Sequence, residues 1–196
     1  LDYFCCFSYF RSLLAIINFK TMKKKLPKFL PKNLRKAFPE FFYNRYTWSF
    51  KNKDLLVSFD FSAGKNKFIA KVKIKNIPAS AKKIKKEIVD NFVFNLGMIE
   101  SFSYWKAFCS PKIIVKCGGI EKEQINWWHN LLIKGMGQYF FENKINFKTK
   151  NFVQIISEKN PTKPMLFKAS KEDFLLPIGG GKDSLTSYYL LNKKKN

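Results

Sequence analysis

Residues 54–62 read Asp54-Leu55-Leu56-Val57-Ser58-Phe59-Asp60-Phe61-Ser62, and apolar and polar side chains alternate along most of this stretch. Such alternation is typical of a strand with one buried face and one face in water. Residues 67–75 alternate in the same way and carry several lysines, and turn-forming residues lie between the two runs. Residues 47–50 are also rich in β-formers. We expect an antiparallel sheet of about three strands over residues 46–76, with one apolar face and one lysine-covered face.

Two long helices are expected after this sheet. Apolar side chains recur every three or four positions over residues 80–105 and again over residues 121–141, which is typical of amphipathic helices. Gly97 lies inside the first helix, where it costs about 1 kcal/mol unless close packing requires it. Short β-rich runs follow the helices, at residues 113–117 and 152–156. We therefore predict an α+β domain over residues 46–160, an antiparallel sheet with two long helices.

Residues 1–45 are expected to form an irregular, basic lead-in, with one short helix in the proline-containing part from residue 26. Residues 1–21 are largely apolar, but the basic residues follow them, which is the reverse of a secretory signal. The apolar stretch is also shorter than the roughly 20 residues of a membrane span. Because the chain begins with Leu1 and a Met22-Lys-Lys-Lys run follows, we expect residues 1–21 not to be native.

The formal net charge of +23 makes nucleic-acid binding one interpretation, since a basic surface attracts phosphate. Nearly all of this charge is lysine, however, and it is spread along the chain. Arginine makes better forked contacts to phosphate and bases, and it occurs only as Arg11, Arg35 and Arg45. Phe, Ile, Asn, Tyr and Lys are abundant together, as in products of A/T-rich genomes. We favour this compositional interpretation over nucleic-acid binding.

The cysteines predict neither a zinc site nor a disulfide framework. The chain has four, at Cys5, Cys6, Cys109 and Cys117. None forms a CxxC pair, and the single histidine, His129, has no metal-ligand spacing to any of them. A reducing cytoplasm is therefore the expected location.

A glycine-rich turn near the end of the chain reads Ile178-Gly179-Gly180-Gly181-Lys182-Asp183-Ser184. An apolar run at residues 174–178 precedes it, and a helical pattern at residues 183–191 follows. Glycine lets a backbone approach an anion closely, and a helix N-terminus offers amides and a positive dipole end. We expect the phosphates of a ligand to bind Gly179, Gly180, Gly181, Lys182, Asp183 and Ser184. Asp183 lies where it could either cap the helix or hold Mg²⁺, and these two roles stay open at this point.

Two better-known phosphate loops do not fit this turn. The Walker pattern GxxxxGK[ST] fails at Leu176 and Asp183, and the Rossmann pattern GxGxxG fails at Ser184. The turn resembles the SGGxDS signature of the PP-loop ATP pyrophosphatase superfamily, with Gly179 in place of the usual first serine. This resemblance implies ATP cleavage between the α and β phosphates and transfer of AMP to the substrate. Residues 173–196 are then expected to be the start of an incomplete α/β PP-loop domain, and the chain alone is expected to be an inactive fragment.

Three blocks carry a more specific resemblance: residues 92–106 with Cys109-Ser110-Pro111, residues 127–128 with 135–143, and the glycine-rich turn. Together they resemble the UDP-N-acetyl-α-D-muramoyl-L-alanyl-L-glutamate epimerase (MurL) family. The resemblance implies an ATP- and Mg²⁺-dependent isomerase of peptidoglycan precursor synthesis. Its substrate would be a UDP-muramoyl dipeptide, UDP-MurNAc-L-Ala-L-Glu, whose terminal glutamate it would convert from L to D with release of AMP.

The acid and base of such an epimerisation stay open at this point. Four residues in the matched blocks have suitable chemistry: Glu100, Lys106, Cys109 and Glu142. Each also has a structural interpretation, because glutamates occupy helix ends, lysines are solvated and cysteine is a small buried hydrophobe. The tryptophans of these blocks are expected in the core: Trp105, Trp127 and Trp128. His129 is expected to be structural.

Two other functions remain as alternatives. Another PP-loop enzyme, such as one that modifies tRNA, would suit the lysine excess and would bind tRNA in a salt-sensitive way. A non-enzymatic nucleic-acid-binding module would tolerate changes at Asp183 but would lose binding when lysines are changed together.

Overall fold

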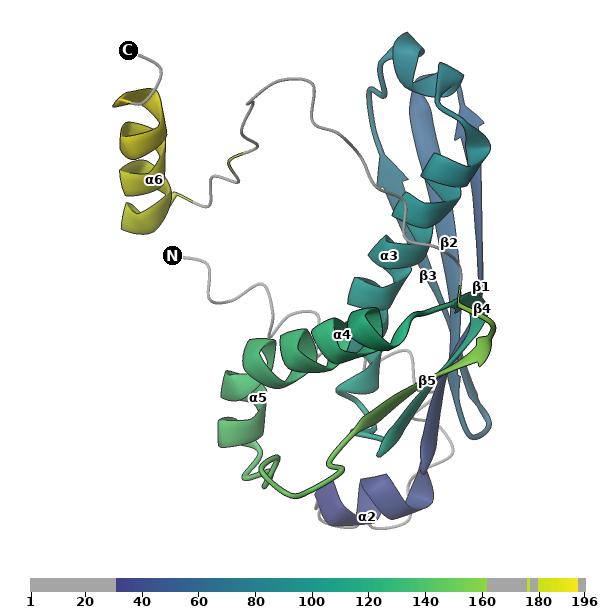
Figure 1. The fold of residues 1–196 in the computed structure, drawn as a ribbon, viewed down its shortest axis with the longest axis vertical. Coiled ribbons are helices and arrows are strands. Elements are labelled where there is room, and N and C mark those ends of the chain that lie inside the picture. The colour runs from purple at the N-terminus through teal and green to yellow at the C-terminus, as the bar shows by residue number, and fades with distance from the viewer. Residues whose placement is uncertain (1–30, 162–175, 177–179, 194–196) are drawn as a thin grey trace, which may run out of the picture. The chain divides into compact units, whose positions relative to one another are not determined.

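The computed structural model describes residues 31–161, 176 and 180–193 (Figure 1). The chain divides into two compact units, residues 1–163 and residues 164–196. The predictions for residues 1–30, and all of the predicted strand at 174–178 except Leu176, lie outside the described residues. Within the described residues, no helix combines the length and the apolar character needed to cross a membrane.

The first unit is built on a five-stranded sheet with the order β3-β2-β1-β4-β5. The strands are β1 (Glu40–Lys51), β2 (Asp54–Ala63), β3 (Asn66–Ile74), β4 (Lys112–Gly119) and β5 (Gln154–Lys159). The strands β1, β2 and β3 pair antiparallel, which confirms the predicted three-stranded antiparallel sheet. The pairs β1–β4 and β4–β5 are parallel, so the whole sheet is mixed rather than antiparallel. Parallel pairing needs a long crossover, which the helical segments before and after β4 provide.

The strand β1 begins at Glu40, six residues before the expected start of the sheet, so the lead-in was predicted too long. Residues 40–43 pair with residues 112–115 of β4. This pairing joins segments far apart in the sequence, and it extends the strand back to the residue that follows Pro39. The short helix predicted in the lead-in is confirmed as α2 (Pro31–Ala37).

The two predicted long helices are present with changed limits. The first is α3 (Lys86–Trp105), and a 3₁₀ turn at Ala79–Lys83 occupies the start of the expected range. The second is divided at Met136 into α4 (Lys122–Gly135) and α5 (Gly137–Glu142). A capping box at the start of α4, in which Glu121 and Gln124 exchange side-chain and backbone hydrogen bonds, fixes where that helix begins.

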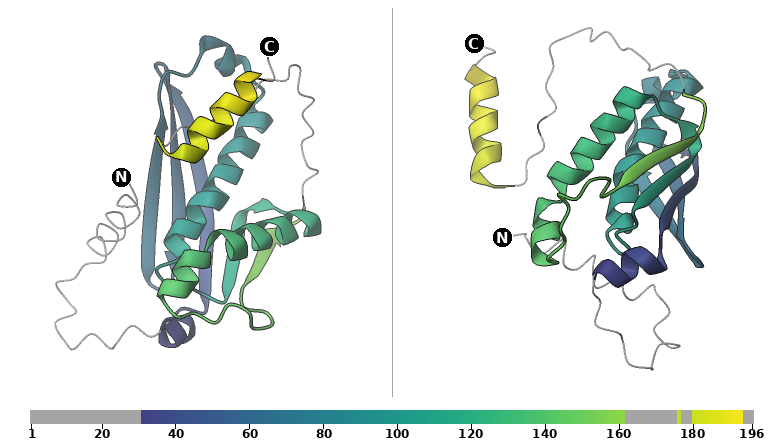
Figure 2. Two further views of the ribbon diagram at one scale, coloured as in Figure 1. Left: turned by 90° about the vertical axis from the view of Figure 1, so that its left-hand side faces the viewer. Right: turned by 60° about the horizontal axis from the view of Figure 1, so that its bottom comes forward.

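The core lies between the sheet and the helices α3 and α4, which lie on the same face of the sheet in both views of Figure 2. Every second residue of β2 is buried, as the alternation predicted. The largest side chains without solvent exposure include Phe41, Tyr43, Phe59, Phe61 and Trp105. On β3 the opposite face carries exposed Lys67, Lys71 and Lys73. The predicted apolar face is therefore confirmed, whereas lysines line the opposite face on β3 and not on β2, where that face carries Asp54, Ser58 and Asp60.

The helix α3 approaches the sheet closely at Gly97. A Cβ atom built on Gly97 would lie 2.0 Å from the Tyr43 hydroxyl oxygen and 2.8 Å from a ring atom of Phe59. Any side chain larger than a hydrogen would therefore push the helix away from the aromatic core. Close packing explains a glycine that weakens the helix itself.

Candidate functional site

The glycine-rich turn is described from Gly180 onward, and Gly179 lies outside the described residues. Gly180 has φ of +77°, the left-handed region that favours glycine. The helix α6 (Lys182–Lys193) starts two residues later. Among the described residues, no other atom lies within 4 Å of a Cβ atom built at Gly180 or Gly181. The backbone of this turn is therefore open to an approaching ligand.

The side chains of this turn face solvent. The Lys182 ammonium lies 3.2 Å from a carboxylate oxygen of Asp183, and both side chains are at least 90% exposed. Such a pair contributes little stability, so both groups can be turned to a ligand at low cost. Asp183 lies in the first turn of α6, where a carboxylate interacts favourably with the helix dipole.

Within the described residues, Asp183 does not belong to a group of side chains that could hold a metal ion without a ligand. The residues that the structure describes contain no cluster of three or more His, Cys, Asp or Glu side chains that could hold an ion. Magnesium, however, is commonly bound by one or two carboxylates together with substrate phosphates and waters. One exposed carboxylate beside a phosphate-binding turn fits that mode and does not fit an all-protein cage.

Cys109 lies in a buried cluster with Arg35. Its backbone has φ of +50°, and its side chain is 1% exposed. The Arg35 guanidinium donates to the Cys109 carbonyl oxygen at 2.6 Å, lies 3.4 Å from the Cys109 sulfur, and also donates to the Phe152 carbonyl oxygen. Burial raises the pKa of the Cys109 thiol, although Arg35 acts in the opposite direction. At neutral pH the thiol is therefore protonated and a poor base.

Lys106 meets the same cluster through its backbone. The Tyr139 hydroxyl donates to the Lys106 carbonyl oxygen at 2.8 Å. Burial raises the pKa of Tyr139, and the neighbouring Cys109 raises it further. The structure thus brings Lys106 and Cys109 together around Tyr139, at the end of α3.

The two glutamates lie elsewhere. Glu100 is half-buried on α3, and burial raises the pKa of its carboxyl group. Glu142 is exposed at the end of α5, where it accepts a hydrogen bond of 2.7 Å from the Gln138 amide. Among the described residues, no hydrogen bond or ion pair connects either glutamate to Cys109. The four candidate acid–base residues therefore do not form one cluster within this unit.

A second buried polar group was missed by the sequence reasoning. The Tyr43 hydroxyl is buried and forms no hydrogen bond in the described part of the chain. Burial raises its pKa, and the neighbouring Cys117 raises it further. Burial likewise raises the pKa of Cys117 to about 12, so this thiol is also un-ionised at neutral pH. The Tyr43 hydroxyl oxygen faces the close approach at Gly97, and we assign both groups to packing.

The tryptophans of the matched blocks differ in burial. The Trp105 indole donates to the Ser110 carbonyl oxygen at 2.8 Å inside the core, and Trp128 packs edge-on against Phe102. Both are buried as expected. Trp127 is 57% exposed, so its expected core position was wrong. It lies on the outer side of α4 and stacks edge-on against Trp128.

A family model described as the MurL N-terminal domain matches residues 32–196. No curated protein and no solved structure matches the chain. The family match includes residues 173–196, so the turn predicted to begin a second domain lies within the stretch that the N-terminal model covers. MurL proteins are epimerases of peptidoglycan precursor synthesis, and this chain belongs to their family through its N-terminal domain.

Proposed function

We propose that this chain is part of an ATP-dependent epimerase that converts the terminal L-glutamate of UDP-MurNAc-L-Ala-L-Glu to D-glutamate. The family match over residues 32–196 is the observation that supports this reaction. The open turn at Gly180 and Gly181, followed by a helix, supports the use of ATP. The pathway of this substrate also makes the cytoplasm the proposed location.

The chemistry explains why such an enzyme needs ATP. A carboxylate holds its α-proton tightly, because loss of that proton would place more negative charge on an anion. Transfer of AMP to the carboxylate, with release of pyrophosphate, removes the charge and allows an enolate-like species to form. Hydrogen-bond donors can stabilise that species. One group then removes the proton from one face, and another returns a proton to the opposite face.

In this proposal the turn binds phosphate and α3 supplies one acid–base group. The backbone at Gly180 and Gly181 is open enough for a phosphate to approach, and Lys182 can neutralise its charge. Asp183 would share Mg²⁺ with the phosphates, where the ion would offset their negative charge. Glu100 is the best candidate for proton transfer, since burial raises its pKa and an acid–base group works best near the operating pH.

The test is AMP release by the full-length protein with ATP, Mg²⁺ and UDP-MurNAc-L-Ala-L-Glu, together with the D-glutamate content of the product. Asp183→Asn should lower AMP release at least tenfold, the loss expected when a charged contact is removed. Glu123→Gln is the matched control, because Glu123 is an exposed carboxylate in the first turn of another helix, α4. It should leave AMP release unchanged. Equal activity of Asp183→Asn and the control would contradict the proposal.

The alternatives give different results in the same assay. A tRNA-modifying PP-loop enzyme would release AMP without any effect of the muramoyl dipeptide, and it would bind tRNA in a salt-sensitive way. A nucleic-acid-binding module would release no AMP and would lose binding when lysines are changed together. The exposed lysines of β3 are the reason for testing these alternatives, because they could bind the phosphates of a nucleic acid.

A further inference from the structure

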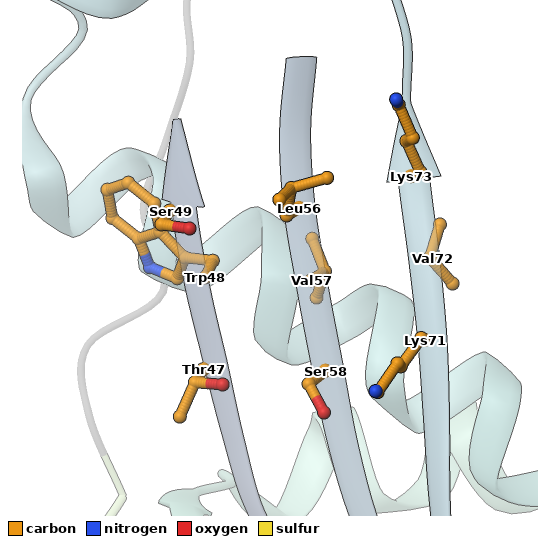
Figure 3. A pocket seen from close by; sticks show the side chains of 9 residues that line it. All are labelled: Thr47, Trp48, Ser49, Leu56, Val57, Ser58, Lys71, Val72 and Lys73. Carbon is orange, nitrogen blue, oxygen red and sulfur yellow. The ribbon is translucent and has the colours of Figure 1, made fainter. Parts of the chain in front are cut away.

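The strands β1, β2 and β3 form a hollow of about 600 Å³ at one end of the sheet (Figure 3). Its lining is Thr47, Trp48, Ser49, Leu56, Val57, Ser58, Lys71, Val72 and Lys73. The volume is within the roughly 300–1,000 Å³ of small-molecule sites. No carboxylate belongs to the lining, whereas two ammonium groups and three hydroxyl groups do.

These polar groups are ordered by the strand register. Thr47, Ser58 and Lys71 are direct neighbours across the three strands, and so are Ser49, Leu56 and Lys73 in the next row of the same face. Neighbouring strands lie about 4.8 Å apart, so the backbone of Lys71 is about 4.8 Å from that of Ser58, and the backbones of Thr47 and Ser49 are about 10 Å from those of Lys71 and Lys73. Figure 3 shows the Lys71 side chain extending toward Ser58. In the first row the hydroxyl residue Ser58 and the ammonium residue Lys71 are direct neighbours, so the two can contact adjacent phosphate groups.

The two lysines differ in their partners. The Lys73 ammonium lies 2.8 Å from a carboxylate oxygen of Asp54, which holds it at the rim of the hollow. Lys71 has no ion pair among the described residues. Asp60, the next acidic residue on this face of β2, is already engaged by Asn44 and Arg45. Lys71 is therefore an ammonium group without a counter-ion, beside two hydroxyl donors.

We propose that this hollow binds the diphosphate of the sugar-nucleotide substrate, an inference that rests on the proposed function for the identity of its ligand. Hydroxyls donate to phosphate oxygens and an ammonium group supplies the point charge. The Trp48 side chain lies on the opposite, helix-covered face, where its indole donates to Asp90 of α3 at 2.6 Å, so no aromatic ring of the lining lies beside the lysines. The hollow therefore suits a small diphosphate ligand better than a single-stranded nucleic acid, which needs stacking platforms.

The experiment measures binding of UDP-N-acetylglucosamine to the 196-residue chain by titration calorimetry in the absence of ATP. ATP and inorganic pyrophosphate are each titrated in a separate arm. Lys71→Gln should weaken binding about tenfold, and Lys71→Arg should restore most of it. Ser58→Ala should weaken it a few-fold, because a neutral hydrogen bond contributes less. Lys67→Gln is the matched control, since Lys67 lies on the same strand and face but outside the hollow. It should change the Kd by less than about twofold, as expected of a screened distant charge.

Competition by inorganic pyrophosphate would support the assignment to the diphosphate. Absence of binding, an unchanged Kd in Lys71→Gln, or equal losses in Lys71→Gln and Lys67→Gln would overturn it. Binding of ATP alone would also overturn it, because the site would then not serve the sugar nucleotide. The titration does not depend on AMP formation. Binding by this chain, together with no AMP release by the full-length protein, would therefore refute the epimerase and leave the hollow intact.

Discussion

The helices α3 and α6 use glycine in opposite ways. In α3, seven residues are buried, and a Cβ atom on Gly97 would lie 2.0 Å from the Tyr43 hydroxyl oxygen. In α6, no residue is buried, and a Cβ atom on Gly181, just before the helix, would meet nothing within 4 Å. The first glycine is required by the protein's own packing. The second has no such role within its unit, which is what a backbone reserved for a ligand would show.

The largest effect is expected from Gly97→Ala. Alanine should gain up to about 1 kcal/mol of helix propensity. The added methyl group cannot fit, because the Tyr43 ring packs against Phe59, Phe61 and Phe94 and has little room to move. Overpacking of a core typically costs about 1–3 kcal/mol. We expect a net loss of about 2 kcal/mol in the free energy of unfolding, measured by urea denaturation.

Two variants sharpen this result. Gly135→Ala is the control, since a Cβ atom there meets nothing within 4 Å and α4 should be unchanged or slightly stabilised. Tyr43→Phe should cost little by itself, because the hydroxyl it removes is buried without a partner. Combined with Gly97→Ala it should recover part of the loss, which a double-mutant cycle detects. A Gly97→Ala protein as stable as the parent would show that the close approach is not rigid.

The fold was predictable where its signal was local. The strands β2 and β3 follow from period-two alternation, and α3 follows from apolar residues three and four apart. The start of β1 was not predictable, because residues 40–43 gain strand structure from β4, about 70 residues later in the chain. The parallel addition of β4 and β5 has the same long-range origin.

The candidate site likewise has a part that could be predicted from the sequence and a part that could not. The glycine-rich turn could be recognised because its residues are consecutive, and the helix after it is confirmed as α6. The contacts around Cys109 could not be recognised from the sequence, because Arg35 lies 74 residues earlier in the chain. One signal was available: arginine is rare in this lysine-rich chain, and Arg35 donates to two carbonyl oxygens from the two terminal nitrogens of its guanidinium.

A smaller effect is expected from Glu100→Gln on α3. Burial raises the pKa of Glu100, so the folded state keeps this proton to a higher pH than the unfolded state does. Stability must then fall as the pH rises from the unfolded value of about 4.3 through the folded one. Glutamine cannot ionise, so it avoids the loss of stability caused by a charge at this half-buried position and should stabilise the protein at pH 7. The gain should be less than about 1 kcal/mol, because the side chain is half exposed.

Urea unfolding of parent and variant at pH 4 and pH 7 tests this directly. The gain should be present at pH 7 and should shrink toward zero at pH 4. Glu142→Gln is the matched control, because Glu142 is exposed on α5 and should show no such dependence. An equal gain at both pH values would mean that the effect comes from packing or helix propensity rather than from the charge.

The smallest effect on stability, and the sharpest test of the comparison, is expected from Gly181→Ala. The new methyl group meets nothing within 4 Å and α6 buries no side chain, so the free energy of unfolding should change by less than about 0.5 kcal/mol. AMP release should nevertheless fall at least tenfold if a phosphate must approach this backbone closely, which only glycine permits. Gly97→Ala should show the reverse pattern, with lost stability and unchanged AMP release per folded molecule. If Gly181→Ala keeps full AMP release, the openness of the turn has no part in ATP binding, and the contrast between the two glycines is one of packing alone.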